Sequence, residues 1–358
     1  MVARNSSFVY KGRAVDVRQV AKELGVRYVL EGSVRRAGER LRITAQLVDG
    51  GGGGHLWADK FDGAVADVFD VQDRITESVV GIVEPHIRHA EIERARRERP
   101  ESLAAYDLYL RALPLHRAGT IKENVQAYEL LSKAIEIEPD NAILLAWTLD
   151  TLLHRTIMGW PQLTGDDRGR VKDYVRRALA NARDDAAVLG RCGNALIQVV
   201  RDADLGLATL KRAVVTNPNS VDVMLFAGIG NVHSGNVEDG LGFFRNALRL
   251  SPRDPYAFVL LTGIAHAQLI LGNFVEGLAA AEHSMSSNAG YDPTYWYLIA
   301  ANAQLGRLED AKSWLGKYQA LMPGMTVERI AKAQPPDPSR FGAVLDGLRA
   351  AGMPESGG

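Results

Sequence analysis

The sequence is poor in the residues that mark several common protein classes. It has one cysteine, Cys192, among 358 residues, which excludes an intramolecular disulfide and a cysteine-ligated zinc site and is typical of a reducing compartment. No apolar run approaches the roughly 18 residues of a membrane-spanning helix, and the N-terminus lacks a signal-peptide pattern. The formal net charge is −1, so no whole-chain charge favours nucleic acid or an acidic membrane. These absences predict a cytoplasmic protein that binds neither.

A 34-residue repeat organises the centre of the chain. Pro218 and Pro252 are 34 positions apart, and each comes five positions after a small residue, Ala213 or Ala247. The alanine lets two helices approach closely, and the proline ends the second helix because it has no N–H to donate. This is the register of a helix–turn–helix repeat.

The same register extends in both directions. It predicts six repeats between about residues 103 and 325. One repeat carries an insertion at 158–167, and Gly235, Gly272 and Gly306 mark turns between paired helices.

The N-terminal region has a different pattern. Residues 15–24 favour a short amphipathic helix, and alternation in 27–35 and 40–48 predicts a hairpin, with a third strand at 55–61. From residue 66 a helical stripe leads into a charged connector. The predicted fold class is therefore mostly α: a partial α/β N-terminal domain followed by an α-solenoid. The predicted domains are residues 1–99, the solenoid at 100–330 and a C-terminal tail at 331–358.

Four patterns that suggest chemistry have simpler explanations. The glycine run 50–54 lacks the Lys-Ser/Thr ending of a phosphate loop, and 15–36 begins like a helix-turn-helix but continues as a strand. His86 and His89 lack a third metal ligand on their face. The glycines 228 and 230 lie within a helix, where close packing explains them. We therefore predict no catalytic residue, no metal, no cofactor and no enzymatic activity.

Six stretches within the first 95 residues carry a family resemblance: 2–12, 15–18, 24–35, 42–49, 55–63 and 69–73. Together they resemble the TolB-like amino-terminal domain of bacterial signalling proteins. The family's opening strand and the helix after it have no counterpart before Val2. The resemblance therefore implies a truncated α/β domain, either a fragment or completed by another chain, and we expect self-association through the incomplete sheet.

The repeats resemble the tetratricopeptide family. Gly235 at the helix–helix turn, Ala247 on the second helix and Pro252 after it carry this resemblance. Residues 247–255 and 348–355 further resemble the solenoid attached to class III adenylate cyclases and related one-chain regulators. In those proteins a cyclase domain or a winged-helix domain precedes the TolB-like domain, and neither is expected in this chain.

We interpret the chain as a non-catalytic interaction module with a protein or peptide partner in the concave groove of the solenoid. The alternative is the regulatory C-terminal part of an adenylate cyclase-type signalling protein. First-helix positions of each repeat face the groove, and they give the candidate partner-binding residues Arg191, Gln198, Ile229, Val232, His266 and Trp296. Trp296, flanked by Tyr295 and Tyr297, is the strongest anchor candidate, and we expect Trp296→Ala to weaken binding without unfolding the repeats.

Overall fold

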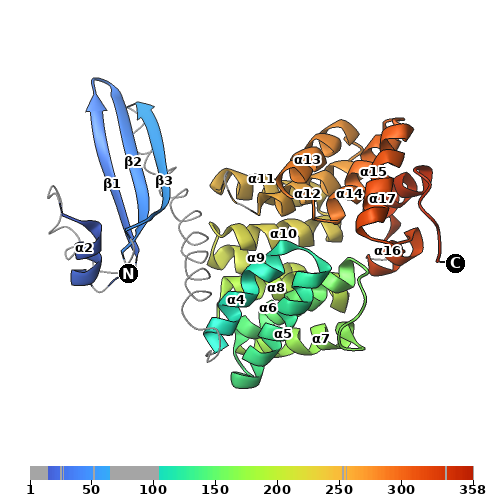
Figure 1. The fold of residues 1–358 in the computed structure, drawn as a ribbon, viewed down its shortest axis with the longest axis horizontal. Coiled ribbons are helices and arrows are strands. Elements are labelled where there is room, and N and C mark those ends of the chain that lie inside the picture. Colours follow the sequence, from blue (N-terminus) through green and yellow to red (C-terminus); the bar gives the residue numbers. More distant parts are fainter. Residues whose placement is uncertain are drawn as a thin grey trace. The chain divides into compact units, whose positions relative to one another are not determined.

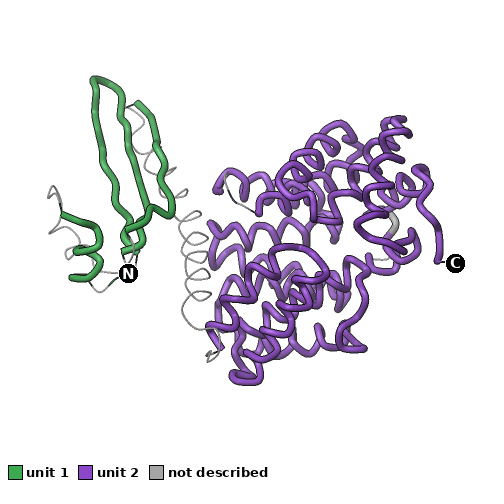
Figure 2. The backbone as a smooth tube through the Cα atoms, in the orientation of Figure 1, with its two compact units in different colours: residues 1–94 green, residues 95–358 purple. Residues whose placement is uncertain are grey.

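A computed structural model of the chain describes residues 15–24, 26, 28–50, 53–64, 105–251, 254, 256–334 and 337–357. The chain separates into two compact units, residues 1–94 and 95–358 (Figure 2). The described residues are mostly α-helical and include one small sheet, which confirms the predicted class. The charged connector, the histidine pair at 86 and 89, the opening strand at Val2 and Pro252 lie outside the described residues. The division into three domains stays a prediction.

The described part of the first unit is a helix followed by an antiparallel meander. Its elements are α2 (Val17–Leu24), β1 (Tyr28–Ala37), β2 (Arg40–Asp49) and β3 (His55–Ala64), paired in the order β1-β2-β3. Gly38 permits the tight hairpin turn because it has a positive φ of 59°. On β2 the alternating residues Leu41, Ala45 and Leu47 are buried, as their period of two predicted.

The described part of the second unit contains six helix pairs (Figure 1). The pairs are α4 (Ala105–Ala118) with α5 (Ile121–Ile137), α6 (Ala142–Ile157) with α7 (Asp167–Asn181), α8 (Ala186–Ala195) with α9 (Ala203–Thr216), α10 (Val221–Ser234) with α11 (Val237–Leu250), α12 (Ala257–Ile270) with α13 (Phe274–Ser287), and α14 (Pro293–Gln304) with α15 (Leu308–Leu321). A π-helical stretch, η2 (Leu196–Val200), continues α8. Two further helices follow, α16 (Val327–Ala333) and α17 (Pro338–Ala350).

Small residues allow the paired helices to pack. Ala213 and Ala247 are completely buried, and the turn glycine Gly235 has a φ of 97°, as the repeat register predicted. A Cβ added to Gly228 would lie 2.4 Å from Cε1 of Phe244. This confirms close helix packing as the reason for that glycine.

The insertion after α6 brings the two ends of the array together. Nε1 of Trp160 donates a hydrogen bond to Oδ2 of Asp292, just before α14, at 3.0 Å. From α16 and its C-terminal end, Arg329 and Gln334 donate to the backbone oxygens of Gly159 and Ile157 at 2.7 and 2.6 Å. The solenoid therefore curves back on itself, a closure that the predicted concave groove did not include.

The last helix covers first helices of the final repeats. Residues 331–358, expected as a tail, contain α17, which packs against α14 and α12 (Figure 1). Phe341, Val344 and Leu348 form its buried stripe, at the i, i+3 and i+7 spacing of one helix face. Gly347 approaches Ala300 so closely that an added Cβ would lie 2.5 Å from the Ala300 Cα.

Candidate binding cavity

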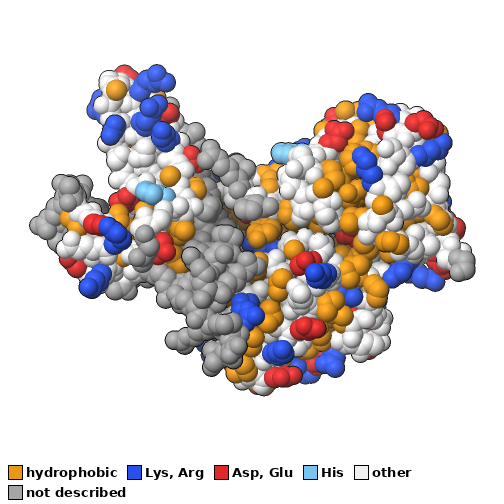
Figure 3. Space-filling model, in the orientation of Figure 1, with side chains coloured by type: hydrophobic (Ala, Val, Ile, Leu, Met, Phe, Trp, Pro, Cys, Tyr) orange, Lys and Arg blue, Asp and Glu red, His pale blue; other side chains and the backbone are white. Residues whose placement is uncertain are grey.

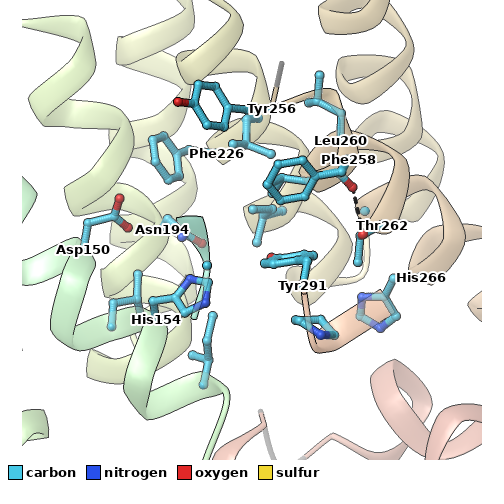
Figure 4. Close-up of a pocket in the computed structure, with 18 of the residues that line it drawn as sticks. Asp150, His154, Asn194, Phe226, Tyr256, Phe258, Leu260, Thr262, His266 and Tyr291 are labelled. Carbon is cyan, nitrogen blue, oxygen red and sulfur yellow. Dashed lines mark hydrogen bonds between the residues drawn. The ribbon is translucent and has the colours of Figure 1, made fainter. Parts of the chain in front are cut away.

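The concave side of the curved solenoid holds a cavity of about 190 Å³ that is partly open to solvent. Its walls come mainly from α4, α6, α8, α10, α12 and α14, the first helix of each repeat. Figure 4 shows the lining side chains around the hollow, with Phe226 and Asn194 on one side and Phe258 and Tyr291 on the other. All six candidate residues line this one cavity: Arg191, Gln198, Ile229, Val232, His266 and Trp296.

A network of ion pairs forms part of the wall. Oδ2 of Asp150 lies 3.3 Å from Nε2 of His116 and 3.5 Å from Nε of Arg191. Nη2 of Arg191 also donates to Asp222 at 3.3 Å, and Arg117 reaches the same carboxylate at 3.4 Å. Burial raises the pKa of Asp150, but the hydrogen bond from His116 and the nearby positive charges outweigh it, so the pKa is lowered. Asp150 is therefore an anion at neutral pH.

Arg191, one of the predicted residues, is the hub of this network. Its guanidinium carbon lies 3.6 Å from the ring centroid of Trp147 and 5.1 Å from that of Phe226. Only 2% of the residue is exposed. A planar cation stacked on an aromatic face and paired with two carboxylates is held in one geometry. The structure thus gives Arg191 a positioning role within the wall.

Neutral histidines line another part of the cavity. Burial lowers the pKa of both His154 and His266 to about 4, and burial likewise puts the pKa of His233 well below its usual range. Nε2 of His266 lies 2.7 Å from the backbone oxygen of Arg340, in α17. By contrast, Nε2 of His154 and Nδ1 of His233 are buried without a hydrogen-bond partner among the described residues.

Two of the predicted groove residues contact α17. The ring of Phe341 lies 5.9 Å from that of Trp296 and 5.3 Å from that of His266. Tyr297 stacks on His266, with 5.3 Å between ring centroids. Trp296 is 1% exposed, so its removal would leave a hole in the core. The expectation that Trp296→Ala spares the fold is therefore replaced by an expected loss of stability.

The other three candidates line the hollow in different ways. Gln198 lies in η2 and donates to Oδ1 of Asn194 at 2.7 Å. Val232 is buried in the core, and Ile229 is partly exposed. The network partners Asp150 and Asp222 were not predicted, because contacts between first helices of different repeats leave no local signal in the sequence. The helix α17 was also not predicted, although Asp337 and Pro338 form a clear helix start before an apolar stripe.

In the described part of the chain, no group of three or more His, Cys, Asp or Glu side chains is arranged to hold a metal ion. Burial raises the pKa of the Cys192 thiol to about 12, so it stays protonated and unreactive. No described helix is long and apolar enough to cross a membrane. On the face shown in Figure 3, side chains of both charge signs are interspersed over the helical unit.

Comparison with known proteins gives one curated relative by sequence. "Putative adenylate cyclase 3" of Rhizobium meliloti (strain 1021) is 38% identical over 179 residues, which are 50% of this chain and 30% of the relative. The chain therefore spans less than a third of the length of that relative. No family model matches the chain.

Comparison with solved structures shows the fold. Human IFIT1, solved as a dimer with m7Gppp-AAAA, is 15% identical with a TM-score of 0.51, over 60% of this chain and 50% of that chain. A monomeric IFIT1 mutant with Gppp-AAAA is 13% identical with a TM-score of 0.52, over 71% and 60%. A tetratricopeptide repeat protein from Parabacteroides merdae is 16% identical with a TM-score of 0.45, over 73% and 98%. The helical unit thus shares the helical fold of the IFIT1 structures.

Proposed function

We propose that the chain is a non-catalytic interaction module whose solenoid binds an apolar helical segment of a partner protein on its concave side. The observation that carries this proposal is the packing of α17. A short helix with one apolar stripe lies on α12 and α14, which are first helices of their repeats. The concave surface is therefore complementary to an amphipathic helix.

The contacts indicate what such a segment needs. Phe341 inserts its ring between those of Trp296, Tyr297 and His266. Val344 and Leu348 are buried further along the same stripe. A partner helix with an aromatic residue followed by branched apolar residues at i+3 and i+7 would make the same contacts after displacing α17.

A peptide in trans tests this proposal. A fluorescein-labelled peptide of residues 337–353 is titrated with the wild-type chain and with Phe341→Ala, and binding is followed by anisotropy. In the variant the internal helix is held less tightly, so the free peptide competes better. We expect Phe341→Ala to bind it at least about tenfold more tightly than the wild type does.

Two controls make the result specific. A peptide with both Phe341 and Leu348 replaced by alanine should not bind, and the chain variant Leu321→Ala, at an exposed position of α15, should behave as wild type. Val344→Ala serves as a milder variant if Phe341→Ala does not fold. The proposal would be contradicted if the folded variants did not bind the wild-type peptide. Equal binding of the wild-type peptide and the doubly substituted peptide would also contradict it.

A second candidate function is the regulatory part of an adenylate cyclase-type signalling protein. It is favoured by the 38% identity to the Rhizobium meliloti relative. On this proposal too, the purified chain forms no cyclic AMP from ATP, with or without Mg²⁺ or Mn²⁺. Cyclic AMP formation above that of a buffer control would contradict the non-catalytic role.

The identification of residues 1–99 as a TolB-like domain belongs to this second proposal. The described meander and its preceding helix α2 agree with the predicted order of elements. Self-association through the sheet stays a prediction, and sedimentation of the purified chain at several concentrations would test it.

A further inference from the structure

The cavity is too large to be a packing imperfection. Protein interiors contain few voids bigger than a water molecule, and this one measures about 190 Å³. An engineered apolar cavity of about 150 Å³ in another protein accommodates benzene. By size, the hollow suits a molecule of one or two rings.

Flat aromatic surfaces surround the hollow. Trp147, Phe226, Phe258 and Tyr291 line it from four different parts of the solenoid, and Figure 4 shows Phe226, Phe258 and Tyr291 around the empty centre. Aromatic side chains on several sides of the cavity favour a ligand that has an aromatic ring, because the rings can make stacked and edge-on contacts with it.

The charges of the cavity are largely satisfied by one another. Arg191 is paired with both Asp150 and Asp222, and Arg117 is paired with Asp222. A charged ligand would have to displace one partner of these ion pairs, and separating a buried ion pair is costly. The network therefore selects against ions.

Several buried polar atoms of the lining residues have no hydrogen-bond partner among the described residues. They are Nε2 of His154, Nδ1 of His233, Nε1 of Trp296 and Nε of Arg191, of which the last lies 3.5 Å from Asp150. A buried polar atom without a hydrogen bond is destabilising. In Figure 4 the ring of His154 points into the hollow, where a ring nitrogen or hydroxyl of a ligand would satisfy it.

The cavity has a route of entry. The cavity is partly open to solvent, and the side chains of Arg117 and Asp222, which line it, remain partly exposed. Near Ile157, in contrast, Gln334 covers the cavity through its hydrogen bond to the Ile157 carbonyl.

We propose that this cavity binds a free, uncharged aromatic molecule of one or two rings with a polar ring atom or substituent. This goes beyond partner recognition, since it adds a small-molecule site at the centre of the solenoid. It does not depend on α17 being displaced.

Indole is the probe for the test, measured by isothermal titration calorimetry and by the shift in Tm of the full chain. We expect saturable binding at one site and a higher Tm, because a ligand that binds only the folded state stabilises it. Tryptamine and indole-3-acetate have the same indole ring with a positively and a negatively charged side chain, respectively. Each should bind at least about tenfold more weakly than indole.

A matched pair of substitutions locates the site. Ile229→Phe fills the cavity, whereas Ile137→Phe makes the same change at a position that is 54% exposed and outside the cavity. Indole binding should be lost in the first variant and kept in the second. Leu225→Phe, also in the cavity wall, replaces Ile229→Phe if that variant does not fold.

Three results would overturn the proposal. These are no saturable binding of indole to the wild type, equal binding to folded Ile229→Phe and Ile137→Phe, and equal binding of the charged analogues. A Gly-Gly-Trp-Gly-Gly peptide that binds as well as indole would likewise refute a free small molecule as the ligand. None of these results affects the trans-peptide experiment. The small-molecule site and the partner-helix site can therefore be refuted independently of each other.

Discussion

Replacing Asp292 by asparagine should make the stability of the helical unit less dependent on pH. Asp292 is 2% exposed. Its Oδ2 accepts the hydrogen bond from Trp160 that joins the insertion to the start of α14, while Oδ1 is buried without a partner. Burial raises the pKa of this carboxyl from 3.8 to about 7.

The direction of the effect follows from proton binding. Between pH 4 and 7 the folded state holds a proton on Asp292 that the unfolded chain has lost, so its contribution to stability falls as the pH rises through this range. The folded pKa of about 7 lies about two pH units above pH 5, and each unit is worth about 1.4 kcal/mol. The free energy of unfolding should therefore fall by about 3 kcal/mol between pH 5 and 8. Above the folded pKa the loss is complete.

The asparagine side chain of the Asp292→Asn variant does not titrate, and its carbonyl oxygen can still accept from Trp160. The variant should therefore gain stability over the wild type as the pH rises from 5 to 8, by about 3 kcal/mol in total. His154 and His266, whose pKa values are about 4, change stability in the opposite direction between pH 4 and 6.5. They are common to both proteins, so they cancel in the comparison.

Urea unfolding followed by circular dichroism at pH 5, 6, 7 and 8 measures this difference. Asp346→Asn makes the same change at a side chain that is 68% exposed, and its difference from the wild type should vary little with pH. A constant difference for Asp292→Asn, or one that shrinks as the pH rises, would refute the reasoning.

Three further predictions concern packing and charge, and urea unfolding at pH 7 measures all of them. Trp296→Ala should lose about 3–5 kcal/mol because its ring is buried, and a loss below about 1 kcal/mol would show that the ring is not part of the core. Gly228→Ala should lose about 1–3 kcal/mol through the clash with Phe244, whereas Gly242→Ala, with open space around its Cβ, should change stability by less than about 1 kcal/mol; equal effects would argue against the close packing. Arg191→Met should lose about 3–5 kcal/mol by leaving Asp150 and Asp222 without their shared partner, and adding Asp150→Asn should recover part of the loss, so no recovery would contradict the network.

Much of the repeat architecture could be predicted because its signals are local. The alanine-to-proline spacing and the glycines 235, 272 and 306 placed the helix pairs and their turns, and all three glycines have the expected positive φ. Similarly, strand alternation placed the meander, since one face of β2 is buried.

The candidate site could be predicted only in part. Counting groove positions found six residues that do line one cavity, because the repeat fixes which face of each first helix is concave. The closure of the array could not be predicted in this way. It depends on contacts such as Trp160 with Asp292, 132 residues apart, which no periodicity within a repeat encodes.

The helix α17 was missed for a different reason. Its apolar stripe of Phe341, Val344 and Leu348 can be recognised in the sequence, but the stripe falls outside the 34-residue register. A segment that does not belong to the repeat is therefore better judged by its own apolar periodicity than by its place in the array.

The proposed partner site requires α17 to be a detachable occupant of the concave side. Hydrogen exchange followed by mass spectrometry tests this directly by comparing amides in α17 with those in α14. If α17 opens independently of the repeats, its amides will exchange at least about a hundredfold faster than those of α14 under native conditions. Equal, globally limited exchange in the two helices would show that α17 is a fixed part of the solenoid and would contradict the proposed partner site.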